Sequence, residues 1–276
     1  MNKKIFLFAV CLLLAGCGDE MLSETPEPEK TVIVLDAGHG ISSYEMTDTE
    51  KSEQGYEYNS EKKQWGEWRH YKNGTFGEDC HGEGCTRLAP EGSSCWYPMG
   101  YGDRNTEPEI NLKNALTAKA YLEQMGYEVR MTRVTNGENP SMNKRASYCF
   151  PENDITKDPD AELYVCIHSN AGGGKGTSYI ELSGEYAQAK ISDDYAVQSN
   201  RAGDIINKSI AEVSGFQLNQ PVKSPHLILF NKLPVPIAYL EIGFYDDAED
   251  IKILETLNDK IGKAIADGVD EYIKSL

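Results

Sequence analysis

The sequence predicts an α/β fold, in which a mixed, mostly parallel sheet carries helices on both faces and is interrupted by one long cysteine-containing insertion. Runs of β-branched and aliphatic residues alternate with segments of helical periodicity, first at residue 31 and then from residue 106 to the end. Strands that alternate with helices usually lie parallel and are buried on both faces. Residues 41–105 show neither pattern, which marks them as the insertion.

The first element of the fold is a strand at 31–36 (TVIVLD), where most residues are β-branched or aliphatic. The first element after the insertion is a helix, because Thr106 and Glu109 fit a capping box and Gly126 fits its end. One face of this helix is apolar and is formed by Leu112, Ala115, Leu116 and Leu122.

The remaining elements follow from the same two patterns. Strands are predicted at 127–131, 161–167, 178–182, 226–230 and 237–240. Helices are predicted at 141–149, 193–213 and 247–274. The sequence shows no internal repeat and no low-complexity tract, so we expect a single folded domain over 31–276.

The N-terminal region has the composition of a targeting signal followed by a tether. Two lysines precede an apolar run and the segment LAGC, so residues 1–16 are predicted to be a lipoprotein signal peptide and Cys17 to be lipidated. An ordinary cleaved signal peptide is the alternative. Residues 17–30 are acidic and contain prolines, as flexible tethers do. We therefore expect the protein to be extracytoplasmic, in a bacterial cell envelope, and lipid-anchored to a membrane.

The formal net charge of −17 restricts the possible partners. A nucleic-acid phosphate backbone selects clustered lysine and arginine, so we expect no nucleic-acid partner. The same charge disfavours electrostatic adhesion to anionic lipid, which leaves the lipid anchor as the expected membrane contact. A solvated acidic surface is the simplest explanation of the charge.

The cysteines are compatible with disulfides, because an extracytoplasmic location permits them. Of the 7 cysteines, Cys11 and Cys17 lie in the signal region, which leaves 7 − 2 = 5. An odd number predicts at least one free thiol, and Cys166 is the best candidate because it lies in a predicted strand. A zinc site in CHGEGC (80–85) is an alternative, with a wider spacing than usual. The pairing stays open among Cys80, Cys85, Cys95 and Cys149.

Side chains that bind metals or transfer protons come directly after three predicted strands: His39, His168 and Glu241. The carboxyl ends of parallel strands form the ligand crevice of an open α/β sheet, so we expect these residues to meet there. Imidazoles and carboxylates are good zinc ligands. A catalytic zinc site also needs a base that deprotonates water, and this requires a second carboxylate.

Glu107 is the best candidate for the second carboxylate. The predicted capping box engages Glu109 with backbone N–H groups and leaves Glu107 free to point elsewhere. The positive end of the helix dipole also stabilises a negative charge at this position. Glu109 remains the alternative ligand.

The chain carries a set of motifs in one order that resembles a known family. The motifs are VLDAGHG (34–40), EPEINL (107–112), TR (132–133), MNKRA (142–146), CIHSNA (166–171) and LEIGFYDD (240–247). Together they resemble the zinc-dependent N-acetylmuramoyl-L-alanine amidases (amidase type 3), which are cell-wall hydrolases with a phosphorylase/hydrolase-like α/β fold. The resemblance covers 31–40 and about 106–276, with Ile41 in place of the family's usual glycine.

The resemblance implies a site and an activity. His39, Glu107 and His168 match the ligands of a Zn²⁺ cofactor, and Glu241 matches the catalytic glutamate. The implied reaction is hydrolysis of the amide between N-acetylmuramic acid and L-alanine of peptidoglycan, by a zinc-activated water with the glutamate as general base. This would serve cell-wall remodelling or lysis. The alternatives are another zinc amide hydrolase, such as a peptidase, and a catalytically weak wall-binding lipoprotein.

Several other residues, and the insertion, have more than one possible role. Asp36 either orients His39 or makes a turn bond, and Asn170 either contacts substrate or forms a turn. Arg133 and Arg145 match family positions and are more typical of structural ion pairs than of catalysis. The tryptophan-rich insertion is interpreted as a lid, a glycan-binding surface or a structural unit with its own core. The sequence identifies no regulatory protein partner.

Overall fold

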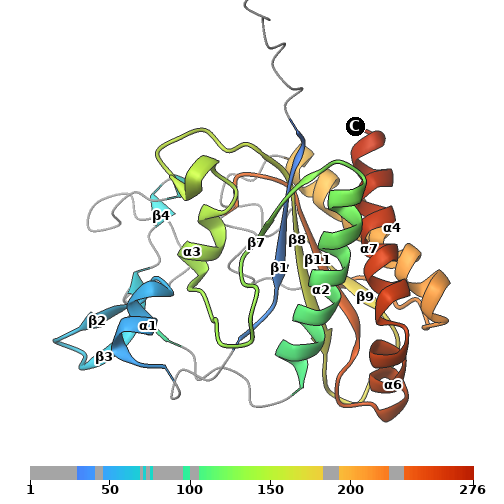
Figure 1. The fold of residues 1–276 in the computed structure, drawn as a ribbon, viewed down its shortest axis with the longest axis horizontal. Helices are drawn as coiled ribbons and strands as arrows, with labels where there is room; N and C mark the ends of the chain where they lie inside the picture. The colour runs from blue at the N-terminus through green and yellow to red at the C-terminus, as the bar shows by residue number, and fades with distance from the viewer. Residues whose placement is uncertain are drawn as a thin grey trace, which may run out of the picture.

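The computed structural model shows one sheet flanked by helices, with a smaller region to one side (Figure 1). It describes residues 30–40, 46–68, 71–72, 75–76, 96–99, 106–182, 193–223 and 233–276. Several predictions fall outside these ranges, namely the signal peptide, Cys17, the strand at 226–230, and Cys80, Cys85 and Cys95.

The main sheet is mixed and mostly parallel, as predicted. In spatial order its strands are β10 (Val222–Lys223), β9 (Ser178–Glu181), β11 (Ile237–Phe244), β8 (Ala161–Asn170), β1 (Val32–Ala37) and β7 (Glu128–Met131). The pair β9–β11 is antiparallel, and the other neighbouring pairs are parallel. Strands β11 and β8 therefore lie in the middle of the sheet, and β1 lies between β8 and the edge strand β7.

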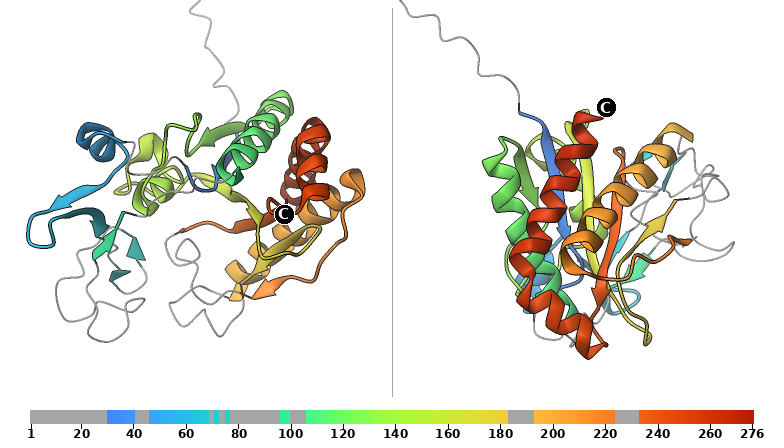
Figure 2. Two further views of the ribbon diagram at one scale, coloured as in Figure 1. Left: turned by 90° about the horizontal axis from the view of Figure 1, so that it is seen from below. Right: turned by 90° about the vertical axis from the view of Figure 1, so that its right-hand side faces the viewer.

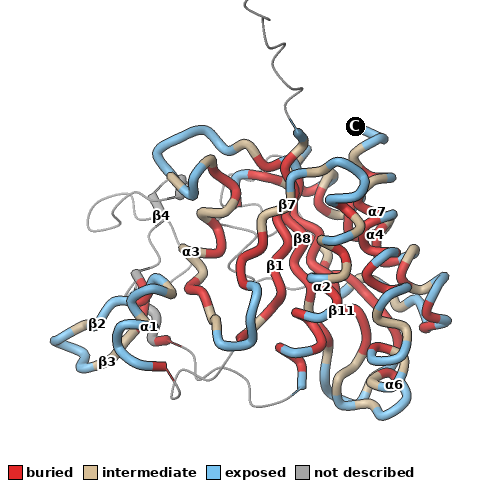
Figure 3. Tube along the Cα trace, in the orientation of Figure 1, coloured by how far each residue is buried: buried red, intermediate tan, exposed pale blue. Residues whose placement is uncertain are grey.

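The inner strand β1 is buried along its whole length, as expected of a parallel strand covered on both faces. Its side chains alternate between the two cores. Ile33 and Leu35 join the core under the long helices, while Val32 and Val34 join the core on the opposite face. Figure 3 shows the buried residues concentrated in the strands and in the helix faces that cover them.

Three long helices pack on one face of the sheet: α2 (Glu107–Gln124), α4 (Asp193–Ser214) and α7 (Asn258–Lys274). They form one layer beside the strands (Figure 2). The opposite face is covered by the short helix α3 (Met142–Ser147), a 3₁₀ turn (Pro151–Asn153) and loop segments. Helices thus lie on both faces, with most of the helical mass on one.

Two details of the predicted helices are wrong. The segment 247–274 forms two helices, α6 (Ala248–Thr256) and α7, because the backbone leaves the helical conformation at Leu257. Leu112, Ala115 and Leu122 of the predicted apolar face of α2 are buried, but Leu116 is 38% exposed. Ile110 and Ala118 complete the buried face instead.

The described part of the insertion forms a separate small unit beside α3 (Figure 1). It contains α1 (Asp48–Glu53), a sheet of β2 (Glu57–Asn59), β3 (Gln64–Trp68) and β6 (Trp96–Pro98), and a second pair, β4 (Tyr71–Lys72) and β5 (Thr75–Phe76). Met46, Tyr56 and Met99 form its core, and Trp65 packs against them. This part of the insertion therefore has a hydrophobic cluster of its own.

The cysteines of the main domain are unpaired. Cys166 in β8 is free and buried, as predicted. Cys149 is also free and buried, so it does not contribute to a disulfide. Burial raises the pKa of the Cys166 thiol well above its usual value, because an apolar surrounding disfavours the thiolate.

Candidate active site

The middle strands bring His168 and Glu241 together. The two residues are directly opposite each other in the register between β8 and β11. The sequence analysis placed both residues just after their strands, which is wrong, because β8 continues to Asn170 and β11 to Phe244. Their place at the carboxyl edge of the sheet is nevertheless the predicted one.

His39 lies on the turn that follows β1, and steric limits shape this turn. A Cβ on Gly38 would lie 2.3 Å from Nε2 of His168, and one on Gly40 would lie 2.1 Å from the Glu138 carbonyl oxygen. Glycine is therefore needed at both positions for space. The left-handed backbone belongs to His39 itself, with φ of 60°.

Glu107 is the carboxylate that reaches the two imidazoles. It is the first residue of α2 and is buried, and its Oε1 lies 3.3 Å from His39 Nε2 and 3.1 Å from His168 Nδ1. The predicted capping box does not form, because Thr106 has helical dihedral angles and makes no capping bond with its side chain. Glu109 is exposed on the other side of the helix start.

One ligand atom each from His39, Glu107 and His168 lies within 4.8 Å of the others. Two imidazole nitrogens and a carboxylate oxygen form a donor set that zinc accepts, and three protein ligands leave a fourth position open. The residues present therefore fit a catalytic divalent metal.

The charges of this cluster are those that metal ligands require. Burial raises the pKa of Glu107, but hydrogen bonds from His168 and His39 outweigh it and lower the pKa to about 2. Burial lowers the pKa of His168 and so favours its neutral form. A carboxylate and a neutral imidazole are the forms that bind a cation.

The environment of Glu241 raises its pKa, in contrast to that of Glu107. Burial, together with the negative charge of Glu107, raises the pKa of Glu241 to about 8. Its Oε2 is buried and has no hydrogen-bond partner within the described part of the chain. A buried carboxylate oxygen is rarely left without a partner, so this atom is suited to accept a proton from a group that enters the site.

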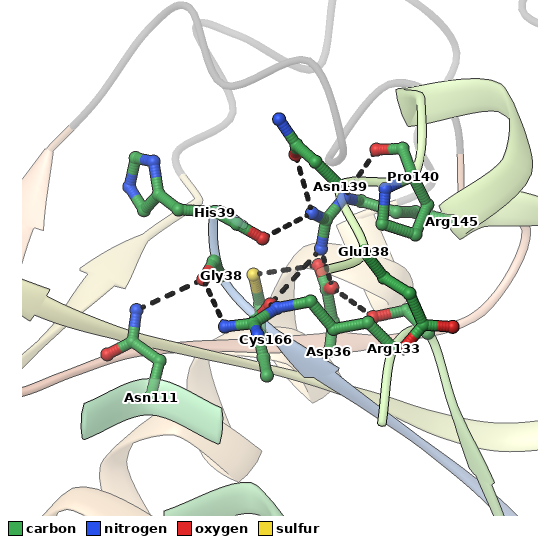
Figure 4. A network of polar contacts seen from close by, with 12 residues as sticks. Asp36, Gly38, His39, Asn111, Arg133, Glu138, Asn139, Pro140, Arg145 and Cys166 are labelled. Atoms are coloured by element: carbon green, nitrogen blue, oxygen red, sulfur yellow. Dashed lines mark hydrogen bonds and ion pairs between the residues drawn. The ribbon is translucent and has the colours of Figure 1, made fainter. Parts of the chain in front are cut away.

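Arg145 fixes the backbone of the turn that carries His39 (Figure 4). Its guanidinium pairs with Asp36 and donates to the carbonyl oxygens of His39, at 2.7 Å, and Ala37, at 3.2 Å. The His39 ring lies on the opposite side of its backbone from Arg145 (Figure 4). Asp36 therefore contacts the backbone of His39 indirectly, through Arg145. Arg145 is buried in an ion pair, as predicted.

Arg133 and Asn111 hold the preceding carbonyl groups (Figure 4). Arg133 donates to the carbonyl oxygens of Ala37, at 2.8 Å, and Gly38, at 3.0 Å. The Asn111 amide lies 3.3 Å from both the Gly38 carbonyl oxygen and Oε1 of Glu107. Asn111 was not singled out in the sequence, although its position four residues after Glu107 places both on one helix face.

Tyr239 is a second contact that the sequence analysis missed. Its ring stacks on the His168 imidazole, with centroids 4.7 Å apart and an interplanar angle of 13°. It lies two residues before Glu241, on the same face of β11. Asn170, by contrast, accepts a hydrogen bond from Ala171 N at 2.8 Å, which favours its role in the turn.

The fold is an α/β sheet with a candidate metal centre at its carboxyl edge, and the comparisons give the family. Residues 33–271 match the model of the N-acetylmuramoyl-L-alanine amidase family Amidase_3. The match extends over most of the chain, and the chain therefore belongs to this family. A comparison with curated protein sequences finds no match.

Solved amidase structures share the fold. The catalytic domain of CwlV from Bacillus (Paenibacillus) polymyxa var. colistinus is 19% identical, with 88% of this chain and 98% of that chain covered and a TM-score of 0.51. An N-acetylmuramoyl-L-alanine amidase from Clostridium difficile 630 is 16% identical, with 89% and 98% covered and a TM-score of 0.54. Ami1 from Mycobacterium smegmatis is 18% identical, with 89% and 98% covered and a TM-score of 0.53.

Replacing Gly38 should damage the metal centre. In Gly38→Ala the new methyl group would lie 2.3 Å from His168 Nε2, so the imidazole has to move. We expect zinc affinity, measured by competition with a chromophoric chelator, to fall at least about tenfold. Gly137→Ala is the control, because its Cβ has its nearest neighbour at 3.7 Å. Equal zinc affinities of the two variants would contradict the geometry described above.

The raised pKa of Glu241 should be visible in the stability of the metal-free protein. Its pKa is about 8 when folded and 4.5 in the absence of the fold, so the unfolded state loses this proton first as pH rises. The free energy of unfolding therefore falls through this window by several kcal/mol, at about 1.4 kcal/mol for each unit of the pKa difference. Glu241→Gln should lack this part of the fall in urea titrations at several pH values, whereas Glu109→Gln should keep it. If the free energy of unfolding depended on pH in the same way for wild type, Glu241→Gln and Glu109→Gln, the raised pKa of Glu241 would be refuted.

Proposed function

We propose that this protein hydrolyses the amide bond between the lactyl group of N-acetylmuramic acid and L-alanine in peptidoglycan. One observation carries the proposal: His39, Glu107 and His168 converge at the carboxyl edge of the sheet, beside Glu241, whose Oε2 is buried. Membership of the amidase family supports the choice of substrate. The same arrangement supports activity over a purely wall-binding role, since binding alone requires neither the ligand set nor the base.

His39, Glu107 and His168 are the residues that would hold a zinc ion. When bound, zinc supplies a water of lowered pKa and polarises the carbonyl oxygen of the scissile amide. Glu107 lends the site a negative charge, and Tyr239 and Asn111 restrain the ring of His168 and the carboxylate of Glu107. These contacts limit the movement of the ligands before any cation arrives, which reduces the cost of assembling the site.

Glu241 is proposed as the general base. Its Oε2, which has no hydrogen-bond partner among the described residues, would accept the proton of the attacking water and later deliver it to the amine of L-alanine as the amide breaks. Its raised pKa suits both transfers, because a group with a pKa near neutral accepts and returns a proton with little cost. No covalent intermediate with the protein is needed.

The activity is tested by identifying the products formed from purified muropeptides. We expect new L-alanine amino termini and intact glycan strands. Glu241→Gln should retain zinc but lose activity by at least about a hundredfold, because general base catalysis contributes on the order of 10²–10⁴. Glu109→Gln, an exposed carboxylate of α2, should retain both.

Three outcomes would change the assignment. Cuts between amino acids of the stem peptide would make the protein a peptidase. Zinc binding without any hydrolysis would make it a wall-binding lipoprotein. Loss of zinc from Glu241→Gln would assign Glu241 to the metal instead of to proton transfer.

We further propose that residues 1–16 are removed as a lipoprotein signal peptide, that 17–30 tether the domain and that 31–276 form the catalytic domain. Within the described residues, no helix has the length and apolarity of a membrane span. An acylated Cys17 would provide attachment to the membrane and place the site in the cell envelope.

The anchor is tested in cells that are fed a labelled fatty acid. We expect label on the wild-type protein and none on Cys17→Ser, because Cys17 is the residue proposed to carry the lipid. A Cys11→Ser variant serves as the control and should still be labelled. Label that persists on Cys17→Ser would refute the anchor.

A further inference from the structure

A buried carboxylate of the insertion lies against the first turn of α3. Glu67, in β3, is 2% exposed, and its two oxygens accept hydrogen bonds from the backbone N–H groups of Met142, at 3.2 Å, and Asn143, at 3.0 Å. Ser141 Oγ accepts a hydrogen bond from Lys144 N at 3.2 Å. The first N–H groups of the helix, which have no partner inside it, are thus bound by the insertion and by the helix's own cap.

Other contacts of the insertion reach the same helix turn. The Gln54 carbonyl oxygen accepts a hydrogen bond from Ser141 N at 2.9 Å, and the Lys144 ammonium group donates to the Glu53 carbonyl oxygen. A Cβ on Gly55 would lie 2.8 Å from Ser141 Oγ, so the two backbones approach closely. The insertion is therefore docked on the start of α3 through main-chain groups as well as through Glu67.

Helix α3 also carries Arg145, which binds the backbone of the turn that contains His39. Arg145 N donates to the Ser141 carbonyl oxygen at 2.9 Å, so Arg145 lies in the turn whose start is held by Glu67. The guanidinium of Arg145 reaches the His39 carbonyl oxygen and the Asp36 carboxylate. A continuous set of contacts therefore runs from the insertion, through the first turn of α3, to the backbone of a proposed metal ligand.

We propose that Glu67 is a positioning residue for the metal site: it fixes the first turn of α3, and through Arg145 it places His39. The inference rests on the proposed function, because it assumes that His39 binds zinc. A buried carboxylate is costly unless it is fully hydrogen-bonded, and the positive end of a helix stabilises it. The described part of the insertion then acts as a support of the site, and its removal weakens metal binding.

The test compares two variants that loosen α3 with one that loosens α1, the helix in the described part of the insertion. Glu67→Gln removes the charge at the start of α3, and Ser141→Ala removes the helix's own cap. Thr47→Ala is the control within the insertion, because Thr47 caps the start of α1 through a hydrogen bond from Glu50 N, whereas the contacts with α3 are made by Glu53 and Gln54 at the other end of α1. Each full-length protein is measured for zinc affinity by chelator competition, for the visible spectrum of its Co²⁺ form and for thermal stability.

We expect Glu67→Gln and Ser141→Ala to weaken zinc binding at least about tenfold and to shift the Co²⁺ spectrum. Thr47→Ala should bind zinc within about twofold of wild type, although its melting temperature falls. Wild-type zinc affinity in both α3 variants would overturn the inference, and so would an equal loss in Thr47→Ala, which would indicate a general loss of stability. If Glu67→Gln does not fold, the comparison of Ser141→Ala with Thr47→Ala decides.

Zinc affinity is measured without substrate, which separates this inference from the proposed function. A wild-type protein that binds zinc but cleaves no amide would reject the amidase activity. The order of zinc affinities among the variants would still decide whether Glu67 positions the site.

Discussion

The buried ion pair between Asp36 and Arg145 is the interaction on which the rest of the site depends. Asp36 is 1% exposed, and it also accepts hydrogen bonds from Thr132 Oγ1, at 2.6 Å, and Cys166 Sγ, at 3.3 Å. Removing water from two charges costs several kcal/mol per ion, so the pair is tolerable only with these partners in place. The partners come from β1, β8, α3 and the segment after β7. The pair therefore fixes these segments relative to one another at the start of the turn that carries His39.

The second constraint is the contrast between two carboxylates in one crevice. Glu107 lies between two imidazoles, and their hydrogen bonds outweigh burial and lower its pKa to about 2. Glu241 is largely removed from water beside that negative charge, and both effects raise its pKa to about 8. One carboxylate is thereby suited to bind a cation and the other to exchange a proton, although both are glutamates at the same edge of one sheet.

The insertion is joined to this arrangement through backbone groups. Each of the hydrogen bonds described above between the insertion and α3 involves a main-chain N–H or C=O group, and only Glu67 and Lys144 contribute side chains to them. Backbone contacts of this kind depend on the path of the chain more than on residue identity. A region without a periodic sequence pattern can therefore still be an ordered part of the structure around the site.

The sequence by itself determined the fold class and the four main residues of the candidate site. Strand and helix patterns are local, and the ends of parallel strands necessarily meet at one edge, so His39, His168 and Glu241 could be placed together without coordinates. Tertiary structure alone decided the remaining features. Glu107 faces the imidazoles because the helix start is packed that way, and not because a capping box engages Glu109. Arg133 and Arg145 bind backbone carbonyl oxygens, and every residue has such an oxygen, so no sequence pattern indicates which ones an arginine will reach.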